Sequence, residues 1–318
     1  MFAITGLEKM MNKKRFFWGV CLGVVFFLLG TGLSGVVYQA RTAKDVVFRV
    51  SNSKAEMDYD FLAALAYLKY RFNQNGYRVL GTAYGGELYP KRFNQAQVNV
   101  YVRGFWPFYD LRRNDEAADV YYIHRIMEIY REEMQGYDYY LSSQKGLDKA
   151  VKEAVNLDFL ESGAVPHEKL EPTYDKDVLY IYEYGNRAYE AFLRENLQAK
   201  VYSGRAFAAL SEEGQKKELS SARLVVYEMG DAGADDKDYV PYAVYDVMSY
   251  GRPVLTNYKV PLEQMFYNDV HLFKKREDMK DVTLKALEMS DQEREQRAQA
   301  AREKLLGIKN ENRFFMKE

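Results

Sequence analysis

The stretch DYVPYAVYDVMSYGRPVLT, residues 238–256, decides the fold, because a hydrophobic segment breaks inside it and resumes at once. We expect a helix from about Tyr242 to Tyr250 and a buried strand from Pro253 to Thr256. Gly251 supplies the left-handed residue that commonly ends a helix, and the proline that follows prevents the helix from continuing. The stretch therefore predicts a helix that turns directly into a strand.

The same alternation of strand-like and helix-like segments runs through the first half of the chain. Apolar residues recur at helical spacing from Phe61 to Phe72, and Gly76 stops that helix. Short apolar runs bounded by polar turns predict strands at Val46–Val50, Tyr77–Thr82, Val98–Arg103, Val120–His124 and Tyr137–Ser142. Such runs are typical of a parallel sheet that is buried on both faces.

A Pro- and Glu-rich segment, residues 156–177, is a candidate hinge before the alternation restarts. The second half predicts strands at Val178–Glu183, Ala199–Ser203 and Arg223–Tyr227, and helices at Tyr189–Asn196, Glu212–Ser220 and from Asp291 to about Lys309. The expected fold class is α/β, with two Rossmann-like domains, residues 45–165 and 175–318, facing a cleft. Ligands bind in such folds at the carboxyl ends of the strands.

The N-terminal segment, residues 1–41, has the pattern of a signal anchor or a signal peptide. The basic cluster Lys13–Arg15 precedes FFWGVCLGVVFFLLGTGLSGVVY, residues 16–38, which is long enough to span a bilayer. A cleaved secretory signal is the alternative, because the most apolar part ends near Leu29 and small residues follow. The basic cluster favours export of the bulk of the chain, although similar numbers of basic residues follow the span. We expect a bacterial membrane protein with a single N-terminal span.

Composition argues against several classes of protein. The formal net charge of -1 gives no indication of nucleic-acid binding. The only cysteine, Cys21, excludes intrachain disulfides and cysteine-based metal sites, and the three histidines, His124, His167 and His271, lack metal-ligand spacing. No metal site is therefore expected. The glycine-rich, phosphate-loop, Gly-x-Ser-x-Gly and His-Glu-x-x-His motifs are absent, which argues against dehydrogenases, P-loop NTPases, serine hydrolases and zincins.

Three polar residues stand where a cleft between the domains is expected. His124 closes an apolar strand, so it could act there as a general base; a hydrogen-bonded structural histidine is the alternative. Asp238 lies just ahead of the helix that begins near Tyr242, and Asp246 lies within it. The start of that helix presents backbone N–H donors to anions, and carboxylates nearby can accept hydroxyl hydrogens from a sugar or ribose.

These residues carry a resemblance to a known family. Asp246-Val-Met-Ser-Tyr-Gly-Arg-Pro-Val-Leu-Thr resembles the Glu-Ala-Met-Ala-x-Gly-x-Pro-Val stretch of GT-B fold glycosyltransferases, and Asp238 falls where they place the first glutamate of a Glu-x7-Glu pair. The wider pattern, clearest over residues 220–279, is similar to the CgeB-like, spore-protein-type family and covers roughly residues 45–315. Aspartate replaces glutamate at both positions, and Ala243 stands where CgeB-like sequences often have arginine.

The resemblance implies a glycosyltransferase that moves a sugar from a nucleotide-sugar donor to a glycan, lipid or protein acceptor. It implies no cofactor and no obligatory metal, with the acceptor bound by the N-terminal domain. In the donor domain, Asp246 would hold ribose or sugar hydroxyls and Asp238 would contact the donor sugar. Arg187 or Arg205 would neutralise the diphosphate, and Gly251 would form the back of the donor pocket.

Two other functions remain open from the sequence. An exported domain would lack nucleotide-sugars, which are cytoplasmic in bacteria, so a non-catalytic glycan-binding or envelope scaffold protein on a degenerate GT-B fold is the main alternative. A periplasmic two-domain solute-binding protein would share the exported two-lobed plan. For that protein the Asp238-x7-Asp246 spacing would be a coincidence.

Overall fold

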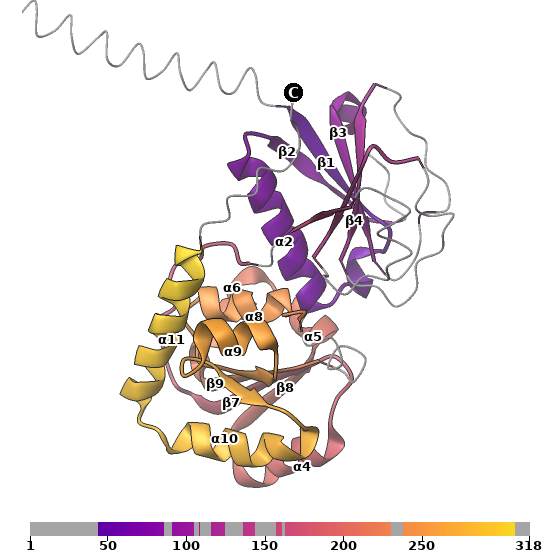
Figure 1. Ribbon diagram of the computed structural model, residues 1–318. Coiled ribbons are helices and arrows are strands. Elements are labelled where there is room, and N and C mark those ends of the chain that lie inside the picture. The colour runs from indigo at the N-terminus through magenta and orange to yellow at the C-terminus, as the bar shows by residue number, and fades with distance from the viewer. Residues whose placement is uncertain are drawn as a thin grey trace, which may run out of the picture.

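The structure, a computed structural model, describes residues 44–85, 91–104, 108, 116–124, 136–143, 157–160, 163–229 and 238–308. It contains two α/β halves, which Figure 1 shows one above the other, each built on its own parallel sheet. The expected membrane span, residues 16–38, lies outside the described residues. Within the described part of the chain, no helix combines the length and the apolar character that crossing a membrane requires.

The first sheet has the strand order β2-β1-β3-β4-β5-β6, and every neighbouring pair is parallel. Its strands are β1 Asp45–Val50, β2 Arg78–Ala83, β3 Val98–Arg103, β4 Ala118–Ile123, β5 Tyr139–Ser142 and β6 Leu157–Phe159. The first five confirm the strands expected from the sequence. Strand β6 lies inside the segment expected to be a hinge, and its three residues are too few to show a pattern.

Helix α2, Tyr59–Gln74, confirms the helix expected from Phe61 to Phe72. The Asp58 carboxylate accepts a hydrogen bond from the Phe61 amide at 2.8 Å and so caps the first turn. The helix gives way to a turn in which Gly76 has a φ of +82°. Two 3-10 turns, η1 Lys54–Glu56 and η2 Lys91–Gln95, complete the described elements of this half.

The second sheet has the order β11-β10-β9-β7-β8 and is also parallel throughout. Its strands are β7 Lys176–Tyr182, β8 Ala199–Ser203, β9 Ala222–Glu228, β10 Val254–Asn257 and β11 His271–Phe273. Its helices are α4 Arg187–Asn196, α5 Gly204–Ala208, α6 Glu212–Ser221, α8 Tyr242–Ser249, α9 Val260–Phe266, α10 Met279–Glu288 and α11 Asp291–Gly307, with a 3-10 turn η4 Arg276–Asp278.

The two sheets share one topology. In each, the second strand lies on one side of the first strand and the third strand lies on the other side. The chain therefore reverses its direction across the sheet between β1 and β3, and again between β7 and β9. Such a switch point, at the carboxyl ends of the strands, is where open α/β sheets bind ligands.

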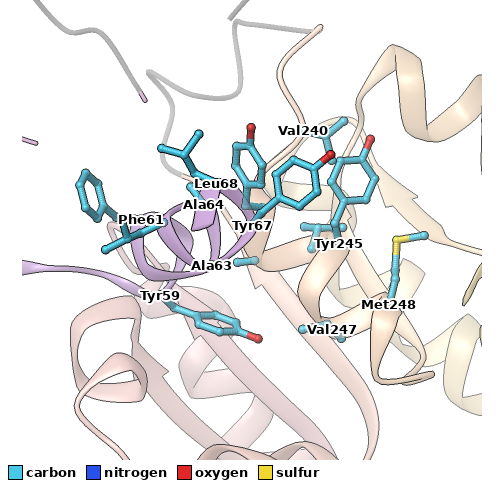
Figure 2. Packing of buried hydrophobic residues seen from close by; sticks show 14 of the residues in the cluster. Tyr59, Phe61, Ala63, Ala64, Tyr67, Leu68, Val240, Tyr245, Val247 and Met248 are labelled. Carbon is cyan, nitrogen blue, oxygen red and sulfur yellow. The ribbon is translucent and has the colours of Figure 1, made fainter. Parts of the chain in front are cut away.

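The two halves are joined by residues 163–175, which form neither helix nor strand, and by direct packing of α2 on α8 and α5. One hydrophobic cluster includes buried side chains from both halves. In Figure 2, Tyr59, Ala63 and Tyr67 of α2 lie on the side of that helix that faces Tyr245 and Val247 of α8. The junction between the domains is therefore part of the core.

The turn at Gly251 confirms the prediction made from residues 238–256. Helix α8 ends at Ser249, Gly251 adopts a φ of +73°, and β10 begins at Val254. Arg252 is buried and bonds the carbonyl oxygens of Leu219 at 3.2 Å and Ala222 at 2.7 Å. The break in the hydrophobic pattern thus marks both a helix end and a buried cation.

Candidate functional site

Three of the predicted site residues lie at one edge of the second sheet. Arg187 follows β7 as the first residue of α4, Arg205 follows β8 in α5, and Asp238 follows β9 ahead of α8. Because the carboxyl ends of parallel strands meet at the same edge, Arg187 and Asp238 flank the switch point between β7 and β9, and Arg205 lies one strand further along the same edge. All three are exposed. This edge therefore presents two cations and one carboxylate to solvent.

Asp246, in α8, is instead engaged within the protein. The Tyr59 hydroxyl of α2 donates to Asp246 Oδ2 at 2.7 Å, and His167 Nε2 lies 2.8 Å from Asp246 Oδ1. The His167 ring stacks on Tyr250 with 4.0 Å between the ring centroids. Burial and the Asp246 charge raise the pKa of Tyr59 well above its ordinary value, so this phenol stays a donor. Asp246 thus links the first domain, the connecting segment and α8.

His124 lies directly after β4, as expected, and only 4% of its surface is exposed. Its Nε2 is 3.3 Å from Asp60 Oδ2, an ion pair when the ring is protonated. Its Nδ1 is buried and has no hydrogen-bond partner among the described residues. Phe61 and Tyr242 pack their rings against the imidazole. In this conformation the histidine is enclosed by the domain junction.

Asp60, in the first turn of α2, is 1% exposed and accepts hydrogen bonds from the second domain. The Tyr239 hydroxyl donates to Oδ2 at 2.7 Å, and the Ala243 amide donates to Oδ1 at 3.0 Å. Burial alone would raise the pKa of the Asp60 carboxyl, but bonds from His124, Tyr239 and Ala243 outweigh it and hold the pKa below its ordinary value. The junction therefore contains a buried, ionised carboxylate.

The N-terminus of α8 accepts an anion, as the sequence predicts, but the anion belongs to the chain itself. Ala243 is the second residue of this helix, and its amide is one of the N–H groups that a helix leaves without an internal partner. Asp60 takes that bond. Ala243 itself is fully buried at this contact.

Gly251 lies at the opposite edge of the second sheet from Arg187, Arg205 and Asp238, because it precedes the amino end of β10. A Cβ at this position would lie 3.1 Å from Lys169 Cγ and 3.3 Å from Arg302 Cδ. Its expected role in ending the helix is confirmed. Its surroundings are the connecting segment and α11, away from the edge that carries the arginines.

The sequence did not point to Asp60, Tyr59, Tyr239 or His167. Tyr59 and Asp60 are the first two residues of α2, the helix that follows β1 at the switch point of the first sheet. Their place after a switch-point strand is the one feature that could have indicated them from the sequence. Their partners lie in the second domain, and Asp60 and Ala243 are 183 residues apart. His167 lies in the segment read as a hinge, 79 residues from Asp246. Contacts of that separation leave no periodic pattern.

No protein-family model and no curated protein sequence matches the chain. Among solved structures, an alpha-glucosyltransferase in complex with UDP and DNA covers 83% of this chain and 95% of its own, with 10% sequence identity and a TM-score of 0.54. An alpha-glucosyltransferase in complex with UDP has the same coverage, 11% identity and a TM-score of 0.52.

These similarities establish a class of fold. The chain has the α/β fold of GT-B glycosyltransferases, with two Rossmann-like halves on parallel sheets, and this part of the prediction is confirmed. At 10% identity the likeness concerns the fold alone. The CgeB-like subfamily is not confirmed, since no family model matches.

Proposed function

We propose that this protein is a nucleotide-sugar-dependent glycosyltransferase of the CgeB-like type, acting on a glycan, lipid or protein acceptor. The observation that supports it best is the position of Arg187 and Arg205, both exposed at the carboxyl ends of adjacent strands β7 and β8 in a GT-B fold. The two alpha-glucosyltransferases of this fold bind UDP, so UDP-sugars are the first donors to test.

The arginines give this edge the means to stabilise a leaving diphosphate without a metal. A guanidinium can bond two phosphate oxygens at once and remains charged as negative charge develops on the leaving group. Asp238, exposed ahead of α8, would accept hydroxyl hydrogens of the donor sugar. Asp246 and His124 are held in the junction, so in this proposal they reach donor and acceptor only when the two domains separate.

The location is proposed from the sequence. The basic cluster favours export of the bulk of the chain, which suits the glycan-binding alternative, because nucleotide-sugars are cytoplasmic in bacteria. For the transferase, residues 16–38 would anchor the protein in a bacterial membrane as a single span, with both domains on the cytoplasmic side where the donor is found. The acceptor would then be a component of the cell envelope.

The proposal predicts that the purified full chain binds a nucleotide-sugar. Calorimetry with UDP-, GDP-, TDP- and CMP-sugars should identify a donor. Arg187→Ala and Arg205→Ala should each weaken its binding about ten- to a hundredfold, because a charged hydrogen bond contributes about 1.5–3 kcal/mol. Arg194→Ala is the matched control. Arg194 is also exposed on α4, but it lies in the last turn, away from the carboxyl edge.

Failure of a folded protein to bind any of these nucleotide-sugars would exclude the proposed activity. Equal weakening by Arg194→Ala would show a general charge effect rather than a site at the carboxyl edge.

A second candidate is the exported glycan-binding or scaffold protein. It is favoured by the hydrogen bonds that Asp60 and Asp246 accept from other residues of the chain. Both carboxylates are occupied by groups of the same chain, which suits a fold retained without its activity. Exposed tyrosines such as Tyr184 and Tyr267 offer amphipathic rings for glycan contact. This candidate gains support if the protein binds glycans and no nucleotide-sugar in the same assays.

A further inference from the structure

Asp60 is the feature that the proposed activity leaves unexplained. A carboxylate that is 1% exposed carries a large desolvation cost, which only a full set of partners offsets. Its partners come from both domains. His124 follows a strand of the first sheet, whereas Tyr239 and Ala243 belong to the second half. The bonds to Tyr239 and Ala243 break if the domains separate.

The hydrogen bond from the Ala243 amide to Asp60 occupies a position where a phosphate group could bind. The start of α8 is the anion-accepting end of that helix, and the helix follows β9, one of the two strands at the switch point of the second sheet. A second group lies beside the same position. His124 is 4% exposed, faces Asp60 through Nε2, packs its ring against Tyr242 at the start of α8, and has an Nδ1 with no partner among the described residues. A diphosphate can be bound by both features, the backbone N–H groups of a helix start and a nearby imidazole.

Access to this position is closed in the structure. Ala243 is 0% exposed, Tyr239 is 2% exposed, and α2 packs directly on α8. No diphosphate can reach the Ala243 amide unless α2 and α8 move apart, and the amide cannot serve two acceptors fully at once. Occupation by Asp60 and occupation by a phosphate are therefore mutually exclusive.

We propose that Asp60 is an intramolecular latch, which closes the two domains by taking the anion position at the start of α8 and which a diphosphate must displace in order to bind. This inference rests on the proposed function for the identity of the ligand. It adds that the closed form is self-inhibited and that donor binding is coupled to domain opening.

The test uses the purified full chain, hydrogen exchange at the start of α8 and calorimetry with inorganic pyrophosphate. Asp60→Asn keeps the shape of the side chain but removes its charge. It should accelerate exchange of the Ala243 amide about tenfold and tighten pyrophosphate binding by a similar factor, because a charged hydrogen bond is replaced by a neutral one. If this variant does not fold, Tyr239→Phe removes one donor to Asp60 and should shift both measurements in the same direction.

Tyr59→Phe is the matched control. It deletes the interdomain hydrogen bond to Asp246 and leaves the Ala243 amide bonded to Asp60, so its effect on Ala243 exchange should be much smaller. Unchanged exchange in Asp60→Asn would overturn the latch. Equal pyrophosphate affinity in wild type and variant would overturn the competition while leaving the proposed function intact. Absence of any pyrophosphate or nucleotide-sugar binding, with accelerated exchange, would reject the proposed function and the competition and retain the latch.

Discussion

At the scale of single residues, a comparison of Gly251 with Gly76 distinguishes the effect of backbone strain from the effect of steric crowding. Its φ of +73° strains any side chain, and a Cβ would also press on Lys169 Cγ at 3.1 Å and Arg302 Cδ at 3.3 Å. Gly76 has a similar φ of +82° with nothing within 4 Å. We predict that Gly251→Ala lowers the free energy of unfolding by about 1–2 kcal/mol and Gly76→Ala by about 1 kcal/mol. Urea unfolding measures both.

The control for these substitutions is Gly307→Ala. Gly307 ends α11, has no positive φ, and has no atom within 4 Å of an added Cβ, so alanine should be neutral or stabilising by up to about 1 kcal/mol. Loss of stability in Gly307→Ala comparable to that in Gly251→Ala would contradict the explanation from backbone conformation.

At the scale of elements, Arg252 joins α6, β9 and α11. Its guanidinium donates to the carbonyls of Leu219 and Ala222 and to Glu295 Oε1 at 2.8 Å, and its side chain is 0% exposed. Arg252→Met would leave two buried carbonyls and a carboxylate without this donor. We predict a loss of about 3–5 kcal/mol in the free energy of unfolding, measured by urea titration.

Arg297→Met is the comparison for Arg252, because Arg297 lies on α11 in a partly exposed pair with Glu293. That substitution should cost about 0.5 kcal/mol or less. Similar losses for the two variants would show that Arg252 acts through surface charge rather than through its buried bonds.

Helices and strands could be predicted where their own residues show a periodic pattern of apolar side chains. Strand β3 has the predicted bounds, and α11 begins at Asp291, the residue at which that helix was predicted to begin. The predicted strands and helices left out β6, β11, α5, α9 and α10. Strands β6 and β11 have three residues each and α5 has five, so each is ordered by its neighbours in the fold rather than by local periodicity.

At the scale of the whole molecule, the strand order explains where the candidate site residues lie. Arg187, Arg205 and Asp238, which the resemblance indicated as donor-binding residues, lie at one edge because each follows a strand of the second sheet. His124 lies where its apolar strand predicted it, directly after β4 of the first sheet. The domain junction could not be foreseen. The hydrogen bonds at this junction depend on how the two sheets pack against each other. Asp246, for example, resembles a donor-binding glutamate, and nothing in the sequence indicates that its partners are Tyr59 and His167.

The same junction predicts how stability depends on pH. The pKa of Asp60 is lowered in the folded protein, so the folded form keeps this carboxyl ionised at pH values where the unfolded chain binds a proton. Its contribution is therefore complete above the ordinary aspartate pKa of about 4, and it is lost as the pH falls through the lower, folded value. Asp60→Asn should cost about 3 kcal/mol at pH 7, and this difference from wild type should shrink at the acid end.

Urea titrations of wild type and Asp60→Asn at pH 7 and at a series of values below pH 5 measure that difference directly. Glu293→Gln, which breaks the partly exposed pair with Arg297, should behave nearly as wild type throughout. A gap between wild type and Asp60→Asn that stays constant down to about pH 2 would mean that the substitution acts through packing, because a gap due to charge must close once both folded and unfolded chains carry a protonated Asp60. If the difference in unfolding free energy between wild type and Asp60→Asn shrinks at acid pH, the charge of Asp60 stabilises the contact between the domains. Another anion that binds at the start of α8 would then have to bind more strongly than the Asp60 carboxylate does.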